Sequence, residues 1–166
     1  KNIVKIDIDS NELFTIPIAI DGQKAIEGIE LIINYNYEDF IFNNFELNND
    51  LNEYNIMIND FIPGKLSLII YTGLGIKNID NIFGEISFNV LDEDISNSTI
   101  DLNKILVNGK DIHSGFLVFD DTKKQYVYSR ELNLSTKLYP EEFHLGACYP
   151  NPFNPITQIP FSIPFD

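Results

Sequence analysis

Apolar and polar residues alternate through most of this chain, and the alternation limits the folds that it can adopt. The segments VKIDI, LFTIPIAI, IELIINYNY, KLSLIIYTG and GEISFNVL are rich in β-branched and aromatic residues. A period of two places successive side chains on opposite faces of a strand. Turn residues such as DGQ, NND, PGK and LDED separate these segments. We therefore predict an all-β antiparallel sandwich or barrel from Lys1 to about Val118.

The segment STIDLNKILVNGKDI does not show the same alternation. Ser98 or Thr99 is a suitable N-cap residue, and Asn108 and Gly109 form a typical helix end, so we predict a short helical turn between them. Further strand-like pieces lie at 116–119 and 125–134. We expect these pieces to close the sandwich.

The composition shifts at Tyr139 and Pro140, where a proline-rich tail begins. This shift predicts a sandwich domain with its closing strands at 1–138, and a separate tail at 139–166. The chain of 166 residues is long enough for one domain of ordinary size plus such an appendage.

The net charge of −14, with only 11 Lys and Arg residues, argues against nucleic acid as a partner. Proteins, glycans or cations suit such a chain better. Its apolar runs are too short to cross a bilayer, so we expect no transmembrane segment. Cys148 is the single cysteine, which excludes an internal disulfide and a cysteine-based zinc cluster.

Four segments taken in order resemble cohesin modules. FTIPIAI is similar to their V-x-V-P first strand, and AIEGIELIINYNYEDFIF to their G-x-x-x-x-L-x-Y-D strand. GKLSLIIYTG and NIFGEISFNVL are similar to the later G-x-L-x-F-L and G-x-I-x-x-I-x-F-x-V strands. The resemblance covers roughly Lys1 to Val118, and Asn36 stands where the family often has Asp. It implies a nine-stranded jelly-roll sandwich, one sheet face of which binds a dockerin, a small module with paired calcium loops.

Strand alternation predicts which side chains face the partner. In GIELIINYNY the core-facing set is Ile29, Leu31, Ile33 and Tyr35, because this register keeps the apolar residues together. The same reasoning, applied to the segments at 65–71 and 84–90, leaves a predicted partner-binding face of Glu30, Ile32, Asn34, Ser67, Ile69, Tyr71, Glu85 and Ser87.

Three apolar residues on this predicted face, Ile32, Ile69 and Tyr71, indicate an interaction site if they lie together. The resemblance to cohesins implies that Glu30 contributes to dockerin recognition. An alternative is that the segment FDDTKKQYVYS of the same chain covers these strands.

No catalytic residue is expected. His113 and His144 lie far apart in sequence and have no matching Ser or Cys motif. The best metal candidate is the loop beginning at Asp92, where Asp94 and Ser96 occupy positions 3 and 5 of an EF-hand pattern. Positions 6 and 12 depart from that pattern, so we expect an acidic turn here and no cofactor, with a calcium site as the weaker alternative.

The tail EEFHLGACYPNPFNPITQIPFSIP resembles the opening of a C-terminal sorting domain of type IX secretion. The residues that precede the core of the motif match the family pattern at Pro140, Phe143 and Leu145. The first strand after the core matches it at 159, 161, 163 and 164. Cys148 replaces the usual Asn. The core of the motif consists of Tyr149, Pro150, Asn151, Pro152, Phe153, Asn154, Pro155 and Thr157.

This resemblance implies that the type IX export machinery is a partner, that the protein is secreted or held at the cell surface, and that 139–166 is a linker followed by a sorting domain cut short after one strand. The alternating residues at its end would suit an edge or docking strand. We thus expect a non-catalytic extracellular protein-binding module. The alternatives are a structural or surface-layer subunit that engages a neighbouring subunit through the terminal strand, and a carbohydrate-binding module.

Overall fold

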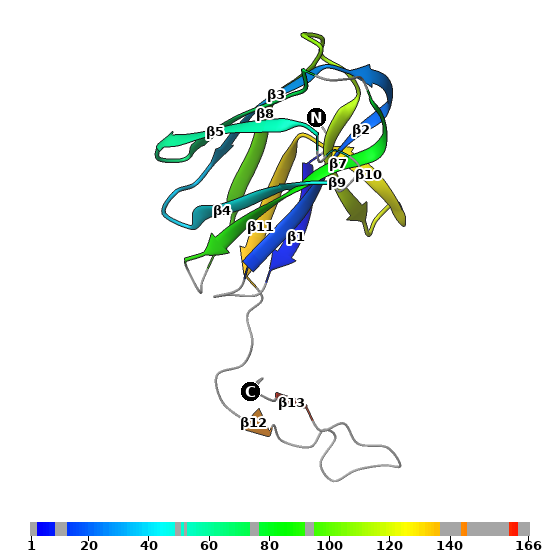
Figure 1. Cartoon of the computed structure of the whole chain (residues 1–166). Coiled ribbons are helices and arrows are strands. Elements are labelled where there is room, and N and C mark those ends of the chain that lie inside the picture. Colours follow the sequence, from blue (N-terminus) through cyan, green and yellow to red (C-terminus); the bar gives the residue numbers. More distant parts are fainter. Residues whose placement is uncertain are drawn as a thin grey trace. The chain divides into compact units, whose positions relative to one another are not determined.

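The computed structural model describes residues 3–8, 13–48, 51, 53–73, 77–91, 95–136, 144–145 and 160–162. The chain forms two compact units, Lys1–Thr136 and Lys137–Asp166. The first unit is a sandwich of two sheets (Figure 1). In the second unit the described residues form one short antiparallel pair, β12 (His144–Leu145) with β13 (Phe161–Ser162).

The larger sheet of the sandwich has six strands in the order β1-β11-β8-β3-β6-β5. Only its β1–β11 pair is parallel, whereas the other neighbours are antiparallel. Their bounds are β1 (Ile3–Ile8), β11 (Glu131–Thr136), β8 (Ser98–Val107), β3 (Gly28–Tyr35), β6 (Lys65–Tyr71) and β5 (Asn55–Ile62).

The smaller sheet has five antiparallel strands in the order β10-β9-β2-β7-β4. Their bounds are β10 (Gln125–Ser129), β9 (Ser114–Asp120), β2 (Leu13–Ile26), β7 (Lys77–Val90) and β4 (Phe40–Leu47). The predicted all-β sandwich is thus confirmed, and the later strand-like pieces do close it as β9, β10 and β11. The described residues of the sandwich hold eleven strands, two more than the nine that the cohesin resemblance implies.

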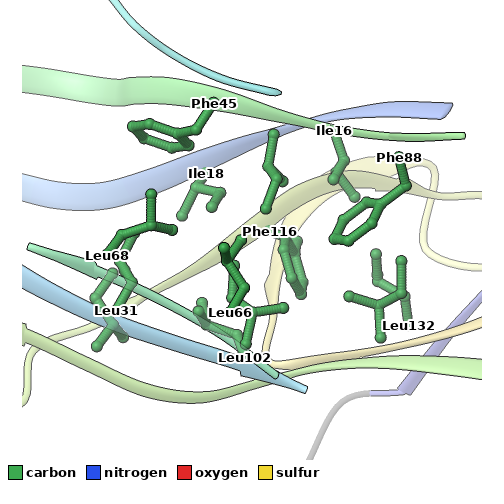
Figure 2. Close-up of a cluster of buried hydrophobic side chains, with 14 of the residues drawn as sticks. Ile16, Ile18, Leu31, Phe45, Leu66, Leu68, Phe88, Leu102, Phe116 and Leu132 are labelled. Atoms are coloured by element: carbon green, nitrogen blue, oxygen red, sulfur yellow. The ribbon is translucent and has the colours of Figure 1, made fainter. Parts of the chain in front are cut away.

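The alternation of apolar and polar residues in the sequence corresponds to an alternation of buried and more exposed side chains along the strands. In β3 the side chains of Ile29, Leu31 and Ile33 are buried, and in β6 those of Leu66, Leu68 and Ile70 are buried. Side chains from both sheets meet in the space between them (Figure 2). The labelled members of this cluster are Ile16, Ile18, Leu31, Phe45, Leu66, Leu68, Phe88, Leu102, Phe116 and Leu132. The core-facing register predicted for β3 and β6 is therefore confirmed.

Phe88 connects the aromatic side chains at one end of this core. Its ring centroid lies 5.1 Å from that of Tyr35 and 6.3 Å from those of Phe40 and Phe42, in tilted or edge-to-face geometry. The ring quadrupoles stabilise edge-to-face pairs beyond the contribution of the apolar area that the rings bury. Burial also raises the pKa of the Tyr35 phenol, because its charged form is poorly solvated there.

The predicted helical turn after Ser98 is wrong, because residues 98–107 form strand β8. Ile100 and Leu102 face the core, then the register with β3 shifts by one residue, and Ile105 and Val107 face the core. Such a β-bulge inserts one extra residue into a strand. The bulge breaks the period of two, so the apolar spacing of the sequence imitates a helix.

Asn108 and Gly109 form a two-residue turn at the end of β8, which joins Val107 to Lys110 in an isolated antiparallel bridge. Their φ angles are 49° and 76°, and the flanking Val107 and Lys110 exchange two backbone hydrogen bonds. Asn and Gly are the residues that a type I′ hairpin turn prefers, since both adopt positive φ. The pair that the sequence suggested as a helix end is a tight turn of this kind at the end of a strand.

We predict that Asn108→Ala lowers the free energy of unfolding by about 1–3 kcal/mol. The Asn108 Oδ1 atom accepts hydrogen bonds from the backbone N–H groups of Glu27 (2.8 Å) and Gly28 (3.1 Å), and alanine removes both bonds while it strains the turn. Urea denaturation measures the change. Asn108→Gly keeps the positive φ, so it should be less destabilising than alanine. Equal stability of Asn108→Ala and the unchanged protein would contradict this account.

Candidate functional site

Six of the eight residues predicted to face a partner lie together on the outer surface of the six-stranded sheet. In the register of β3 with β6, Glu30 is opposite Ile69 and Ile32 is opposite Ser67. Asn34 and Tyr71 lie on the same surface, since they follow the same alternation. Ile69 is 47% exposed and Tyr71 42% exposed, which is high for apolar side chains in inner strands of a sheet.

Glu85 and Ser87 do not belong to this face, and their grouping with it is wrong. Both lie in β7, between β2 and β4 in the five-stranded sheet. Alternation correctly predicts that the Glu85 side chain faces outward, but Glu85 lies on the outer surface of the five-stranded sheet. Ser87 is only 8% exposed, and its Oγ atom accepts a hydrogen bond from Asn43 Nδ2 and donates one to the carbonyl of Asn44.

Three further residues, which were not predicted from the sequence, complete the face. Met57 of β5 is opposite Ile69, and Leu106 and Lys104 of β8 are opposite Glu30 and Ile32. The helical interpretation of 98–107 hid the two β8 residues. Met57 was missed because NIMINDFI holds three consecutive apolar residues and does not alternate. We call the surface made by Glu30, Ile32, Asn34, Met57, Ser67, Ile69, Tyr71, Lys104 and Leu106 the β3–β6 face.

Glu30 forms an ion pair within the β3–β6 face. Its Oε1 atom lies 2.7 Å from Lys104 Nζ on the neighbouring strand β8. The two side chains are 42% and 38% exposed, so water screens the pair and it adds little to stability. A charge pair of this kind is available to a partner, because a partner carboxylate or ammonium group can take the place of either member.

A shallow pocket of about 340 Å³ opens at one end of the β3–β6 face. Gly28 lies opposite Tyr71 in this pocket and contributes no side chain. A Cβ atom at Gly28 would meet only the carbonyl of Ile70, at an ordinary contact distance of 3.4 Å, so the backbone does not require glycine here. What the glycine provides is space. The pocket is lined by Glu27, Gly28, Ile29, Glu30, Ile69, Ile70, Tyr71, Leu106, Asn108 and Gly109.

The segment FDDTKKQYVYS does not cover the β3–β6 face. It forms the end of β9, a turn and all of β10, and both strands belong to the five-stranded sheet (Figure 1). In the turn, Asp120 Oδ1 accepts the backbone N–H groups of Thr122 and Lys123, and the Lys123 ammonium lies 3.1 Å from the other carboxylate oxygen. The alternative that this segment hides the face is therefore wrong.

Two other predicted sites fall largely outside the described residues. Asp92 and Asp94 of the metal candidate are among the residues that the structure does not describe, and Ser96 lies exposed in a bend before β8. No group of three or more His, Cys, Asp or Glu side chains within the described ranges could hold a metal ion. The core of the tail motif, 149–157, also lies outside the described residues. Within the described residues, no helix is long and apolar enough to span a membrane.

No protein-family model matches the sequence, and no curated protein matches it either. The structure, however, is similar to solved cohesin modules. A type I cohesin–dockerin complex from Clostridium thermocellum has a TM-score of 0.53 at 13% identity, with 81% of this chain and 94% of that chain covered. The seventh ScaB type I cohesin from Pseudobacteroides cellulosolvens has a TM-score of 0.52 at 16% identity, with 86% and 96% covered.

The cohesin module of a family 33 glycoside hydrolase from Clostridium perfringens is also similar. Its TM-score is 0.51 at 16% identity, and the match covers 82% of this chain and 93% of that chain. Identities this low show the fold alone. The sandwich of this chain has the jelly-roll fold of cohesin modules, as the order of its strands in the sequence suggested.

Proposed function

We propose that this chain is a non-catalytic protein-binding module that binds a dockerin-type partner through its β3–β6 face. The observation that carries the proposal is the apolar row of Met57, Ile69 and Tyr71 beside an open pocket, on an exposed sheet face of a cohesin-like sandwich. Three of the similar structures are complexes of a cohesin with a dockerin. An exposed apolar patch with a polar rim is typical of an interaction surface.

The chemistry of the β3–β6 face indicates the kind of contact. The pocket beside Gly28 has room for one apolar side chain of a partner, between Tyr71 and Leu106. Glu30 lines the pocket and Lys104 pairs with Glu30, so both can pair with charges on the partner. Fully burying an aliphatic side chain contributes about 1.5–3 kcal/mol, so one well-filled pocket changes affinity by roughly ten- to a hundredfold.

We further propose that the tail directs the chain to the cell exterior. This rests on the sequence of 149–157, whose resemblance to a type IX sorting motif holds at eight positions. Prolines at 150, 152 and 155 restrict the backbone and hold the residues before them away from helical conformations. An extracellular location suits a module whose partner is another exported protein.

We predict that Ile69→Asp weakens partner binding by at least about tenfold, because it removes apolar contact area and buries a charge. Isothermal titration of the purified chain with a panel of dockerin modules, with and without calcium, measures the affinity. Ile41→Asp is the matched control, since Ile41 is 51% exposed on β4 of the other sheet. Binding by no dockerin under either condition, or equal loss in both variants, would overturn the proposal.

Charge-reversing substitutions on each sheet test which of the two sheets binds the partner. Glu30→Lys places two ammonium groups together with Lys104 on the β3–β6 face, so we expect weaker binding of any partner that contacts Glu30. Glu85→Lys makes the same change on the outside of the five-stranded sheet, where Glu85 is opposite Glu46. The second variant should bind as the unchanged protein does. If Glu85→Lys weakens binding as much as Glu30→Lys, the interface lies elsewhere.

For the tail we predict that the protein is found outside its native cell and accumulates in the periplasm when the type IX export channel is inactivated. Cell fractionation and protease treatment of intact cells measure the location. A resident periplasmic protein serves as the control for leakage. An unchanged surface location after loss of the channel contradicts the assignment of the tail.

A further inference from the structure

The edge strand β5 exposes apolar side chains on both of its faces. It is the last strand of the six-stranded sheet, beyond β6, and its outer edge has no partner strand among the described residues (Figure 1). Met57 is 59% exposed and Phe61 is 89% exposed, and Ile58 and Ile62 are also exposed. Edge strands of this kind are templates for pairing with another strand, unless charges, prolines or bulges block them.

The regular part of β5 is uncharged and reads the same in both directions. Residues 55–59 are N-I-M-I-N, and the register with β6 becomes irregular only after Asn59. We propose that two copies of this chain pair through their β5 edges, antiparallel and with Met57 opposite Met57. This inference goes beyond the proposed function and does not depend on it.

In this register each residue of 55–59 lies opposite a residue of the same type in the second copy. Asn55 is opposite the second copy's Asn59, and Ile56 is opposite its Ile58. Residues directly opposite in an antiparallel pair project on the same face, so Met57 and the two asparagines form the outer row and the isoleucines form the inner row. The two-fold axis passes between the two Met57 residues, as in the isologous interface of a symmetric dimer.

The pairing buries apolar surface that the single copy leaves in water. Ile58 follows the core-facing alternation of β5, yet it is 42% exposed. An inner row of four isoleucine side chains, two from each copy, covers this surface. The backbone hydrogen bonds fix the direction of the strands, and the apolar rows supply the free energy.

The other three edges are less suited to self-pairing. In β1 the apolar Val4 and Ile8 are already buried, so pairing there covers little further apolar surface. In β4 the register shifts between Phe42 and Asn44. A two-fold pairing of β10 centred on its middle residue would place Lys124 opposite the second copy's Arg130, and like charges directly opposite are unfavourable.

Each copy carries a net charge of −14, which opposes association. Salt screens this repulsion, whereas the β5 interface contains no charge within 55–59 that salt could weaken. Higher salt should therefore favour the dimer. A continuous sheet would also place two β3–β6 faces on the same side of the dimer, so that a partner with two modules binds both.

Sedimentation equilibrium of the full chain tests the proposal. We expect a monomer–dimer equilibrium, with the molar mass rising from 19.0 kDa to twice that value as the concentration increases toward roughly millimolar, and with a tighter dimer at high salt. A mass of one copy at every concentration and salt level overturns the inference. So does association that salt weakens.

Two substitutions locate the interface. Met57→Lys puts two ammonium groups opposite each other at the axis and should weaken the dimer at least about tenfold, whereas Ile41→Lys on β4 should leave it unchanged. Circular dichroism checks that both variants are folded. Equal effects of the two variants overturn the assignment to β5.

A cysteine variant gives a second test that does not depend on the lysine variant folding. Met57→Cys, combined with Cys148→Ser, should form a disulfide-linked dimer under mild oxidation, because the Cα atoms of directly opposite residues are within the range that a disulfide bridges. Ile41→Cys with Cys148→Ser is the control and should stay monomeric on a non-reducing gel. Cross-linking of the control and not of Met57→Cys overturns the proposed register.

Discussion

The packing of β3 and β6 against the opposite sheet is the constraint on which the rest of this structure depends. Ile29, Leu31 and Ile33 are almost completely buried, and a shift of one residue would bring Glu30 and Asn34 into the core. Burying an unpaired carboxylate is strongly unfavourable, so the shifted register does not compete with the observed one. The core therefore fixes the position of every side chain on the β3–β6 face, although none of them takes part in it.

The sequence was sufficient to predict the fold class, the inward and outward side chains of three strands, and six of the nine residues of the β3–β6 face. It was not sufficient to assign strands to sheets. Both sheets of a sandwich have the same period of two, so Glu85 and Glu30 show the same pattern although they lie on opposite sides of the molecule. Sheet membership depends on pairing between distant segments, and a single sequence does not record that pairing.

The second failure has a local cause. Alternation holds on either side of the bulge in β8, and one extra residue between Leu102 and Ile105 joins two correct strand patterns into a false helical one. The residues affected include Lys104 and Leu106, which belong to the candidate site. A bulge re-aims the side chains around it, so a binding face can include residues at which strand alternation fails.

At Gly28, a substitution can change the surface that a partner contacts without changing the core. Its backbone conformation is available to other residues, and a Cβ atom would make an ordinary contact with the carbonyl of Ile70. A side chain at this position would nevertheless occupy the pocket between Tyr71 and Leu106. The shape of the β3–β6 face can therefore change at position 28 without a change in the core, because the core fixes only the inward half of each strand. This division allows one sandwich to present different surfaces to different partners.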